Sequence, residues 1–598
     1  MLRIRALIGI FVAAFMLAVC GAARAQSPDE VTGPWHGVLT LPGSSSGAAV
    51  VLTIARNGDG TLAAIFGQAY SGANAQAAVS SVAVKDDVLT FAIARANASF
   101  EGKWNAAQHR WDGTFKQGSL NLPLVLEPGK PPARPFVAGM DGAWQGVIER
   151  NGAKLRLVLR VATADYGTIV TLDSPDQLSY NQDVPVFSRK DTKVALALPA
   201  TGASYEAALA QGGAQMTGIW KRPGQPDASV TFTRSATPVA QFSTDRPQTP
   251  KPPFDYRVEN VTFENPEQKD ISLAGTLTLP KGNGPFPAAI LISGSGANDR
   301  DDTALGHKPF AVIADHLTRH GFAVLRYDDR GVGGSKGDHD AADSVDFASD
   351  ANAAARFLMS RPDIRHDAIG FIVHSEGGVT GPLAMASNKQ VAFLVMLGGP
   401  GVRWDRMLLT QIRLIGLSRG KTKAELDRAE PKLAAIYRAM AHARSEDDAS
   451  KAVAPMLTPE ILIALGAPPD ADREQLARQM SSRWARYLFG YDPATNLKKI
   501  RVPVLAMTGS LDVQIPAKDN LPAIKAALAG DRDVTVKQLP GLNHLFQTAK
   551  TGAPGEYADI QETFAPAALD LMTDWLVQRF ARPSAAALTK ALENRKAP

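Results

Sequence analysis

Cysteine is almost absent from this sequence, since Cys20 is the only one in 598 residues. A disulfide within the chain is therefore excluded, and cysteine-based nucleophilic chemistry beyond the N-terminal segment is excluded with it. Strong charge is also lacking, because the formal net charge is +5 and no long basic run occurs. The composition therefore predicts no nucleic-acid partner and no acidic membrane surface as partner. Hydrophobic residues at 45% and charged residues at 21% exclude wholesale disorder.

A hydrophobic run long enough to cross a membrane is also missing. The apolar run Ala6–Val19 has 14 residues, which rise about 21 Å as a helix, short of a hydrocarbon core of about 30 Å. Arg3 and Arg5 precede this run, and Ala23-Arg24-Ala25 follows it, a pattern typical of a signal peptide cleaved before Gln26. We expect residues 1–25 to be a signal peptide and the protein to be exported, either periplasmic or secreted, with no permanent membrane span.

Cys20 leaves a second possibility for this segment. Leu17-Ala18-Val19-Cys20 loosely resembles a lipoprotein attachment box. Val19 argues against lipid attachment, because the residue before a modified cysteine is usually small.

Long helical periodicity is absent from residues 26–245. Alternating apolar runs such as Ala49–Ile54 and Leu155–Val161 are separated by turn sequences such as Asn57–Gly60, a pattern typical of β-hairpins. This part of the chain is predicted to be all-β.

The β-rich region repeats some of its residues. Gly33-Pro34-Trp35-His36-Gly37-Val38 returns as Gly142-Ala143-Trp144-Gln145-Gly146-Val147, and Ser99-Phe100-Glu101 returns as Ser204-Tyr205-Glu206. We expect two copies of one β unit, residues 26–130 and 136–245, each a small barrel or sandwich, with coincidence as the alternative.

The pattern changes after a Pro-rich linker at residues 246–254, which we expect to be stiff and extended. Apolar strands then alternate with helical stretches, which predicts an α/β domain with a mostly parallel sheet over residues 255–583. A helix-rich insertion at about 401–496 is too long for a loop and is interpreted as a cap over the sheet, and residues 584–598 form a tail. The expected strands are Ala288–Ile292, Ala323–Tyr327, Ala368–Val373, Phe393–Leu397, Val504–Met507 and Val534–Lys537.

Two serines compete as a catalytic nucleophile. Ser335 has the literal Gly-x-Ser-x-Gly pattern, but it lies in a Gly-rich loop with no helix after it. Ser375 follows a buried strand directly and precedes a plausible helix, which is the strand–turn–helix order of a nucleophile elbow. The departure is Val373, where the pattern has glycine, and its bulk next to a strained turn needs extra room. Ser375 is the predicted nucleophile, with a helix N-cap as its simplest structural alternative.

The base and the acid follow the serine in chain order in hydrolases with such an elbow. Only His442 and His544 come after Ser375, and His442 lies in the expected cap, so His544 is the predicted base. Asp512 comes directly after a strand and is the predicted acid that orients the imidazole. The rival carboxylates are Asp531 and Asp533, which precede the last strand, and Asp519, which opens a helix.

The oxyanion site is predicted from two backbone N–H groups, those of Glu376 and Ser295. Ser295 lies in the loop Ser293–Asp301, where glycines at 294 and 296 let the backbone approach a substrate. A simple tight turn is the alternative for this loop. It lacks the Gly-Lys-Ser/Thr ending of a phosphate-binding loop.

In combination, these motifs resemble bacterial serine carboxylesterases of the α/β-hydrolase superfamily, of an exported type with a β-rich N-terminal extension. The resemblance covers roughly residues 256–583. It rests on the elbow at 374–378, the loops at 293–296 and 327–333, and the segments at 509–512 and 541–544. It implies hydrolysis of small-molecule esters with short acyl chains, without metal or cofactor, and a mainly structural role for Asp328 and Arg330.

Other functions on the same residues stay open at this point. A peptidase or an acyltransferase would use the same three side chains. A catalytically dead binding or scaffold protein is a further alternative, which Val373 favours. The sequence predicts neither the natural substrate nor the oligomeric state.

Overall fold

The computed structural model describes residues 31–581 except 41–47, 71–75, 94–97, 118–119, 151–152, 165–166, 178, 224, 238–245, 466 and 468–470. The expected signal peptide at 1–25, with Cys20, and the expected tail at 584–598 lie outside the described residues. The chain divides into two compact units, residues up to 136 with 164–169, and residues 137–163 with 170 onward. Within the described residues, no helix is long and apolar enough to cross a membrane.

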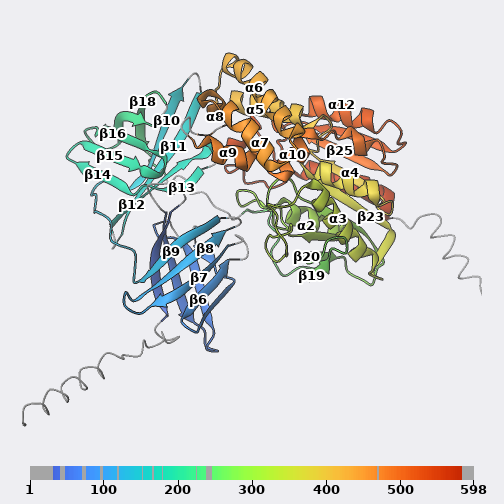
Figure 1. Ribbon diagram of the computed structural model, residues 1–598, viewed down its shortest axis with the longest axis horizontal. Helices are drawn as coiled ribbons and strands as arrows, with labels where there is room; N and C mark the ends of the chain where they lie inside the picture. Colours follow the sequence, from blue (N-terminus) through green and yellow to red (C-terminus); the bar gives the residue numbers. More distant parts are fainter. Residues whose placement is uncertain are drawn as a thin grey trace, which may run out of the picture. The chain divides into compact units, whose positions relative to one another are not determined.

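The first sheet has nine strands, each antiparallel to its neighbours, and is drawn in blue in Figure 1. Its order is β4-β3-β2-β1-β9-β8-β7-β6-β5. The first and last strands in the chain, β1 and β9, therefore pair with each other, and the two edge strands, β4 and β5, are consecutive in the chain. Strands from β1 to β9 bury Trp35, Phe66, Phe91 and Trp111 in one cluster, so the sheet curls around a single core as a barrel does. The strands are β1 (Gly33–Leu39), β2 (Ala48–Arg56), β3 (Leu62–Gln68), β4 (Gln76–Ala78), β5 (Ser81–Lys85), β6 (Val88–Ile93), β7 (Ala98–Asn105), β8 (Arg110–Gln117) and β9 (Leu120–Pro128).

The second sheet has the same strand plan, with the order β13-β12-β11-β10-β18-β17-β16-β15-β14. Trp35 Nε1 donates to Val31 O at 2.8 Å, and Trp144 Nε1 donates to Met140 O at 2.9 Å, four residues upstream in both cases. The strands are β10 (Gly142–Arg150), β11 (Ala153–Ala164), β12 (Gly167–Ser174), β13 (Ser179–Asp183), β14 (Val186–Lys190), β15 (Lys193–Leu198), β16 (Ala203–Leu209), β17 (Gln215–Lys221) and β18 (Ala228–Arg234). The region expected to be all-β therefore consists of two similar nine-stranded sheets.

The third sheet has eight strands in the order β19-β20-β22-β21-β23-β24-β25-β26. The first two pairings are antiparallel, and all the others are parallel. The strands are β19 (Arg257–Glu264), β20 (Ser272–Leu279), β21 (Phe286–Ile292), β22 (Ala323–Tyr327), β23 (Ile364–His374), β24 (Leu394–Leu397), β25 (Val504–Gly509) and β26 (Val534–Leu539). The apolar runs of the sequence form the buried parallel strands, because both faces of this sheet are covered.

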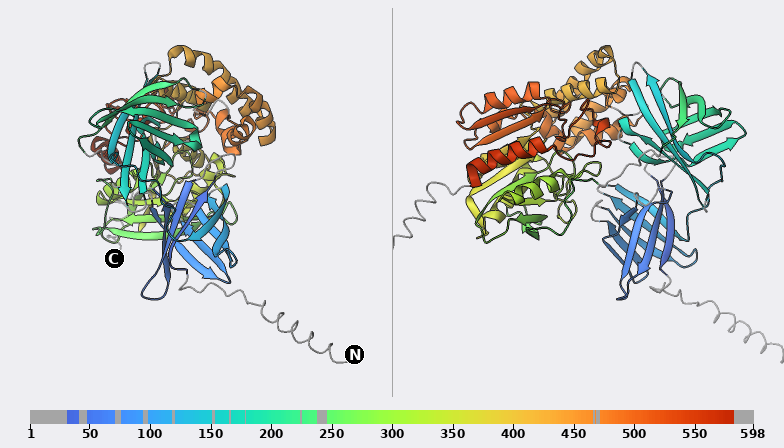
Figure 2. Two further views of the ribbon diagram at one scale, coloured as in Figure 1. Left: turned by 90° about the vertical axis from the view of Figure 1, so that its left-hand side faces the viewer. Right: turned by 180° about the vertical axis from the view of Figure 1, so that it is seen from behind.

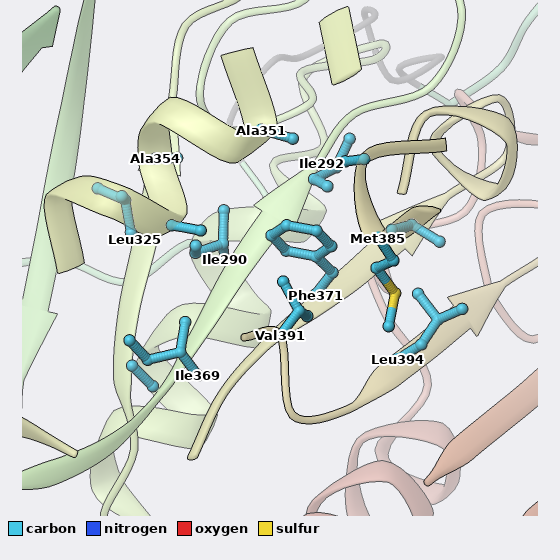
Figure 3. Packing of buried hydrophobic residues seen from close by; sticks show 14 of the residues in the cluster. Ile290, Ile292, Leu325, Ala351, Ala354, Ile369, Phe371, Met385, Val391 and Leu394 are labelled. Atoms are coloured by element: carbon cyan, nitrogen blue, oxygen red, sulfur yellow. The ribbon is translucent and has the colours of Figure 1, made fainter. Parts of the chain in front are cut away.

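Helices pack on both faces of this sheet, and Figure 2 shows the sheet and its helices from two further sides. On one face, α3 (Ser344–Met359), α4 (Gly377–Ser387) and α12 (Ala517–Ala527) pack in one core cluster. On the other face, α2 (Pro309–Arg319) and α13 (Pro566–Leu576) form a second cluster. In Figure 3, Ile369 and Phe371 of β23 lie among Ile290 and the α3 alanines Ala351 and Ala354. Small residues on α3 let that helix approach the sheet closely.

A helical cap interrupts the sheet between β24 and β25. Its own apolar cluster includes Trp404, Leu433, Ile436 and Leu488, so it holds a separate core. The helices are α5 (Trp404–Ser418), α6 (Lys423–His442), α7 (Glu446–Val453), α8 (Pro459–Leu465), α9 (Arg473–Met480), α10 (Arg483–Gly490) and the short α11 (Ala494–Leu497).

The Pro-rich segment from residue 246 is attached to the domain built on the third sheet rather than free. Arg246 is 1% exposed and donates to the main-chain oxygens of Leu305, Ala558 and Ile560. The Gln248 side chain accepts from the N–H groups of Thr563 and Phe564. The segment expected to be a stiff spacer is therefore held along the domain by buried hydrogen bonds.

Candidate active site

Ser375 lies between the end of β23 and the start of α4, in the strand–turn–helix order expected from the sequence. Its φ is +51°, a left-handed conformation that non-glycine residues adopt rarely and mostly at functional turns. Its N–H donates to Leu397 O at 3.0 Å, and its carbonyl accepts from Gly378 N at 2.9 Å. The side chain is therefore held at the carboxyl edge of the sheet, where the residue is half-buried.

The room that Val373 needs comes from two glycines on α4. A Cβ at Gly381 would lie 2.7 Å from Val373 Cγ1, and a Cβ at Gly377 would lie 3.2 Å from Val373 Cβ. Val373 itself is fully buried. The sharp turn thus accommodates valine because the following helix carries no side chain where the valine packs.

Asp512 and His544 follow β25 and β26 and meet at the same edge of the sheet. His544 Nδ1 lies 2.8 Å from Asp512 Oδ2, and both side chains are buried. Asp512 Oδ1 also accepts from the N–H groups of Gln514 and Ile515, each at 2.8 Å, which fixes the carboxylate. A carboxylate in this position holds the imidazole with its proton on Nδ1 and leaves Nε2 free to take a proton.

Gly398, at the end of β24, leaves space for this pair. A Cβ on Gly398 would lie 3.3 Å from both Asp512 Oδ2 and His544 Nδ1, and its φ of +58° is in the glycine-favoured region.

Ser375 lies near this pair without being hydrogen-bonded to it. The ring of the preceding residue, His374, is 5.0 Å from the His544 ring, centroid to centroid. Among the described residues, no hydrogen bond joins the Ser375 hydroxyl to the imidazole. Nucleophile–base contacts of unliganded enzymes are often longer than the hydrogen-bond limit and shorten when substrate binds.

The loop after β21 passes directly beside the nucleophile. A Cβ on Gly294 would lie 3.2 Å from Ser375 Cβ. The Asn298 side chain donates to the carbonyls of Gly294 and Gly296, and Asp329 accepts from Asn298 N at 2.9 Å. Burial raises the pKa of Asp329 well above its usual value. Asp329 holds this loop in place, although no motif of the sequence predicted that role.

Neither predicted oxyanion donor has an internal partner. Within the described residues, the main-chain N–H groups of Ser295 and Glu376 donate to no protein acceptor. A buried N–H is almost always paired in a folded protein, so the main-chain N–H of the buried Glu376 is an exception.

The Glu376 side chain connects the elbow to the cap. Its Oε1 accepts from Trp484 Nε1 at 2.8 Å and from Ser344 Oγ at 3.0 Å. Burial raises the pKa of this carboxyl, and hydrogen bonds including one from Ser295 oppose the rise. No sequence signal pointed to Trp484, which lies 108 positions further along the chain.

Ser335, the literal motif match, has a structural role. Its hydroxyl donates to Asp328 O at 2.7 Å and accepts from Ala274 N at 2.9 Å, so the hydroxyl is engaged by the main chain on both sides. Asp328 is ion-paired with Arg300, and Arg330 with Asp350.

The rival base and acids lie elsewhere. His442 is exposed at the end of α6, Asp533 is paired with Arg579, and Asp519 lies in the first turn of α12. Among the described residues, no group of three His, Cys, Asp or Glu side chains is arranged to hold a metal ion.

Known proteins resemble the C-terminal part of this chain. Residues 308–548 match the family model described as serine aminopeptidase, S33. Esterase EstD of Thermotoga maritima is 27% identical over 341 residues, which are 56% of this chain and 72% of that protein. Acyl-coenzyme A amino acid N-acyltransferase 2 of Rattus norvegicus is 34% identical over 134 residues, 22% of this chain and 28% of that protein. The solved Pyrococcus furiosus esterase PF2001 is 13% identical, with 54% of this chain and 92% of that chain covered and a TM-score of 0.34.

The family match and the esterase relative agree with the sheet order and with the elbow. The C-terminal part of the chain is a hydrolase of the α/β-hydrolase type, preceded by all-β sheets.

Proposed function

We propose that the protein is a serine carboxylesterase that cleaves small-molecule esters with short acyl chains through an acyl-enzyme on Ser375. His544 Nε2 takes the Ser375 proton while Oγ attacks the ester carbonyl, and Asp512 stabilises the imidazolium. The N–H groups of Ser295 and Glu376 donate hydrogen bonds to the developing oxyanion. His544 then gives its proton to the leaving alcohol.

Water completes the cycle along the same proton path. It loses a proton to His544 Nε2 as it attacks the acyl carbon, and Ser375 leaves with that proton restored. No step requires a metal or an organic cofactor.

One observation carries this proposal: the buried Asp512–His544 hydrogen bond lies at the sheet edge that also presents Ser375 on a strained turn. Its nearest structural alternative, Ser375 as a helix N-cap, is disfavoured because α4 starts after Glu376 and has no side-chain cap. The relative named as an esterase supports ester substrates.

The test compares Ser375→Ala with Ser360→Ala, an exposed serine at the end of α3, using p-nitrophenyl butyrate. We expect kcat to fall by at least about a thousandfold in the first variant and to be unchanged in the second, with both variants folded by circular dichroism. Wild-type activity in Ser375→Ala would refute the assignment.

A peptidase or an acyltransferase is the second candidate, because the matching family is described as serine aminopeptidase and one relative as an N-acyltransferase. The purified protein is offered a p-nitrophenyl ester, an aminoacyl p-nitroanilide, and the ester with an added amine acceptor. Ester cleavage without anilide cleavage or amide product supports the esterase.

A catalytically dead scaffold was favoured by Val373 alone. The space at Gly377 and Gly381 removes that argument. A fluorophosphonate probe should label wild-type protein stoichiometrically at Ser375, whereas a scaffold would stay unlabelled.

Export is also part of the proposal. The residues that support it, Arg3, Arg5 and Ala23-Arg24-Ala25, are a sequence pattern only. N-terminal sequencing of the exported protein should give Gln26. Lipid attachment would instead leave Cys20 as the first residue.

We further propose that the two β sheets are copies of one unit. The shared strand order and the equivalent bonds of Trp35 and Trp144 support duplication.

A further inference from the structure

A second histidine–aspartate pair lies next to the first. His374 Nδ1 is 2.8 Å from Asp302 Oδ2, and His374 Nε2 is 3.3 Å from the main-chain oxygen of His544. Both side chains are buried, and Asp302 adopts a left-handed φ of +52°. The mechanism above uses neither residue.

The partners of His374 determine how many protons the pair holds. A carbonyl oxygen accepts hydrogen bonds and cannot donate one, so the Nε2 contact requires a proton on Nε2. The Nδ1 contact with Asp302 requires a proton between those two atoms. Without the Nε2 proton, the nitrogen and carbonyl lone pairs would face each other inside the protein. The pair therefore holds two protons, one more than a neutral imidazole beside an ionised carboxylate.

Three loops meet at this pair. Asp302 belongs to the segment after β21, which also carries Ser295, while His374 ends β23 directly before Ser375. His544 lies in the loop after β26. One buried imidazole thus connects the oxyanion loop, the nucleophile elbow and the backbone of the base.

We infer that His374, held doubly protonated by Asp302, is a positioning residue that fixes the main chain of His544 for proton transfer with Ser375. This inference rests on the proposed hydrolase function of Ser375 and His544. It adds a titrating group that acts through the backbone of the base, without touching the substrate.

The charges around His374 set the direction of its titration. Burial lowers its pKa, while the charge and hydrogen bond of Asp302, the His544 carbonyl and the charge of Asp512 raise it, and the net result is a raised pKa. Facing groups are Asp302 from the loop after β21, Asp512 from the loop after β25 and the His544 ring. Because the folded pKa is raised above about 6.5, the protonated pair persists through that value and is lost only as the pH rises through the raised pKa. Activity should therefore decline on the alkaline side when the Nε2 donor disappears.

Two variants of the full chain separate positioning from mere packing. Asp302→Asn removes the charge that opposes burial, so the alkaline limb of kcat/KM should move down by about one pH unit or more. His374→Gln keeps an amide of similar length that does not titrate. It should lower the plateau by about ten- to a hundredfold and remove this alkaline limb. His366→Gln, an exposed histidine on the same strand, is the matched control and should keep the wild-type profile.

A second measurement needs no turnover. The chain has 10 histidines, few enough for selective ¹⁵N-histidine labelling, with the His374 signal assigned by its loss in His374→Gln. We expect both ring nitrogens of His374 to carry protons at pH 6.5, and one to lose its proton at lower pH in Asp302→Asn than in wild type.

The outcomes distinguish this inference from the proposed function. An unprotonated Nε2 in wild type at pH 6, or an alkaline limb unchanged in Asp302→Asn, would overturn the inference while Ser375→Ala still abolished activity. Full activity of Ser375→Ala would overturn the hydrolase proposal, and the histidine spectrum would still report the protonation of the pair.

Discussion

At the scale of single residues, the nucleophile elbow requires glycine at position 381, because the Val373 side chain packs against it. Gly381→Ala would place a methyl group 2.7 Å from Val373 Cγ1, so we expect it to lower the free energy of unfolding by about 1–3 kcal/mol. Adding Val373→Ala should recover part of this loss, because the two side chains share one space. Urea denaturation measures both effects.

Gly490→Ala is the matched control, since its new Cβ would meet only Ala441 Cβ, at 3.9 Å. Equal costs at positions 381 and 490, or strict additivity of the Val373 and Gly381 changes, would contradict this account.

The sequence predicted individual side chains best where chemistry requires a fixed chain order. Ser375, Asp512 and His544 each follow a strand directly, and parallel strands bring their carboxyl ends to one edge. The contact between His374 and Asp302 joins positions 72 apart and depends on a left-handed backbone at Asp302, for which no motif exists. The space for Val373 could not be predicted from the sequence either, because it depends on which face of α4 packs against β23.

At the scale of elements, α10 of the cap is tied to the nucleophile elbow by one hydrogen bond from Trp484 to Glu376. Trp484→Phe keeps the ring but leaves a buried carboxyl with one donor fewer, which should cost about 1–3 kcal/mol of stability. Thermal and urea unfolding of the full chain measure this cost. Tyr487→Phe on the same helix removes a hydroxyl that makes no hydrogen bond to Glu376 and should change stability little. Equal effects of the two variants would show that the Trp484 bond contributes nothing.

Element types were predictable from periodicity, whereas their attachments were not. The parallel strands are continuous apolar runs, as strands covered on both faces must be, and the long insertion after β24 forms helices as its length indicated. The bond that fixes α10 to the elbow depends on how the cap packs, and a single sequence carries no signal for that packing.

At the scale of the whole molecule, the segment that leads from the second β sheet into the hydrolase domain is fixed by Arg246. Pro residues made a stiff spacer the natural expectation, but Arg246 is 1% exposed and binds three carbonyl oxygens from the segments around 305 and 558–560. The second of those segments also binds Arg156 of the second sheet through Asp559. Arg246 of the linker and Arg156 of the second sheet therefore both bind the segment 558–560.

Replacing Arg246 tests whether this attachment stabilises the domain that carries Ser375. Arg246→Ala leaves buried carbonyl groups without their charged donor, so the free energy of unfolding should fall by about 1–3 kcal/mol. Lys281→Ala, at an exposed lysine, should change it by less than about 0.5 kcal/mol. Limited proteolysis of the full chain adds a second measurement. An unattached linker should become the first site of cleavage, while the hydrolase domain stays intact and active. Resistance to cleavage at wild-type stability would show that the Pro-rich segment is held by its own stiffness and that the buried guanidinium is dispensable.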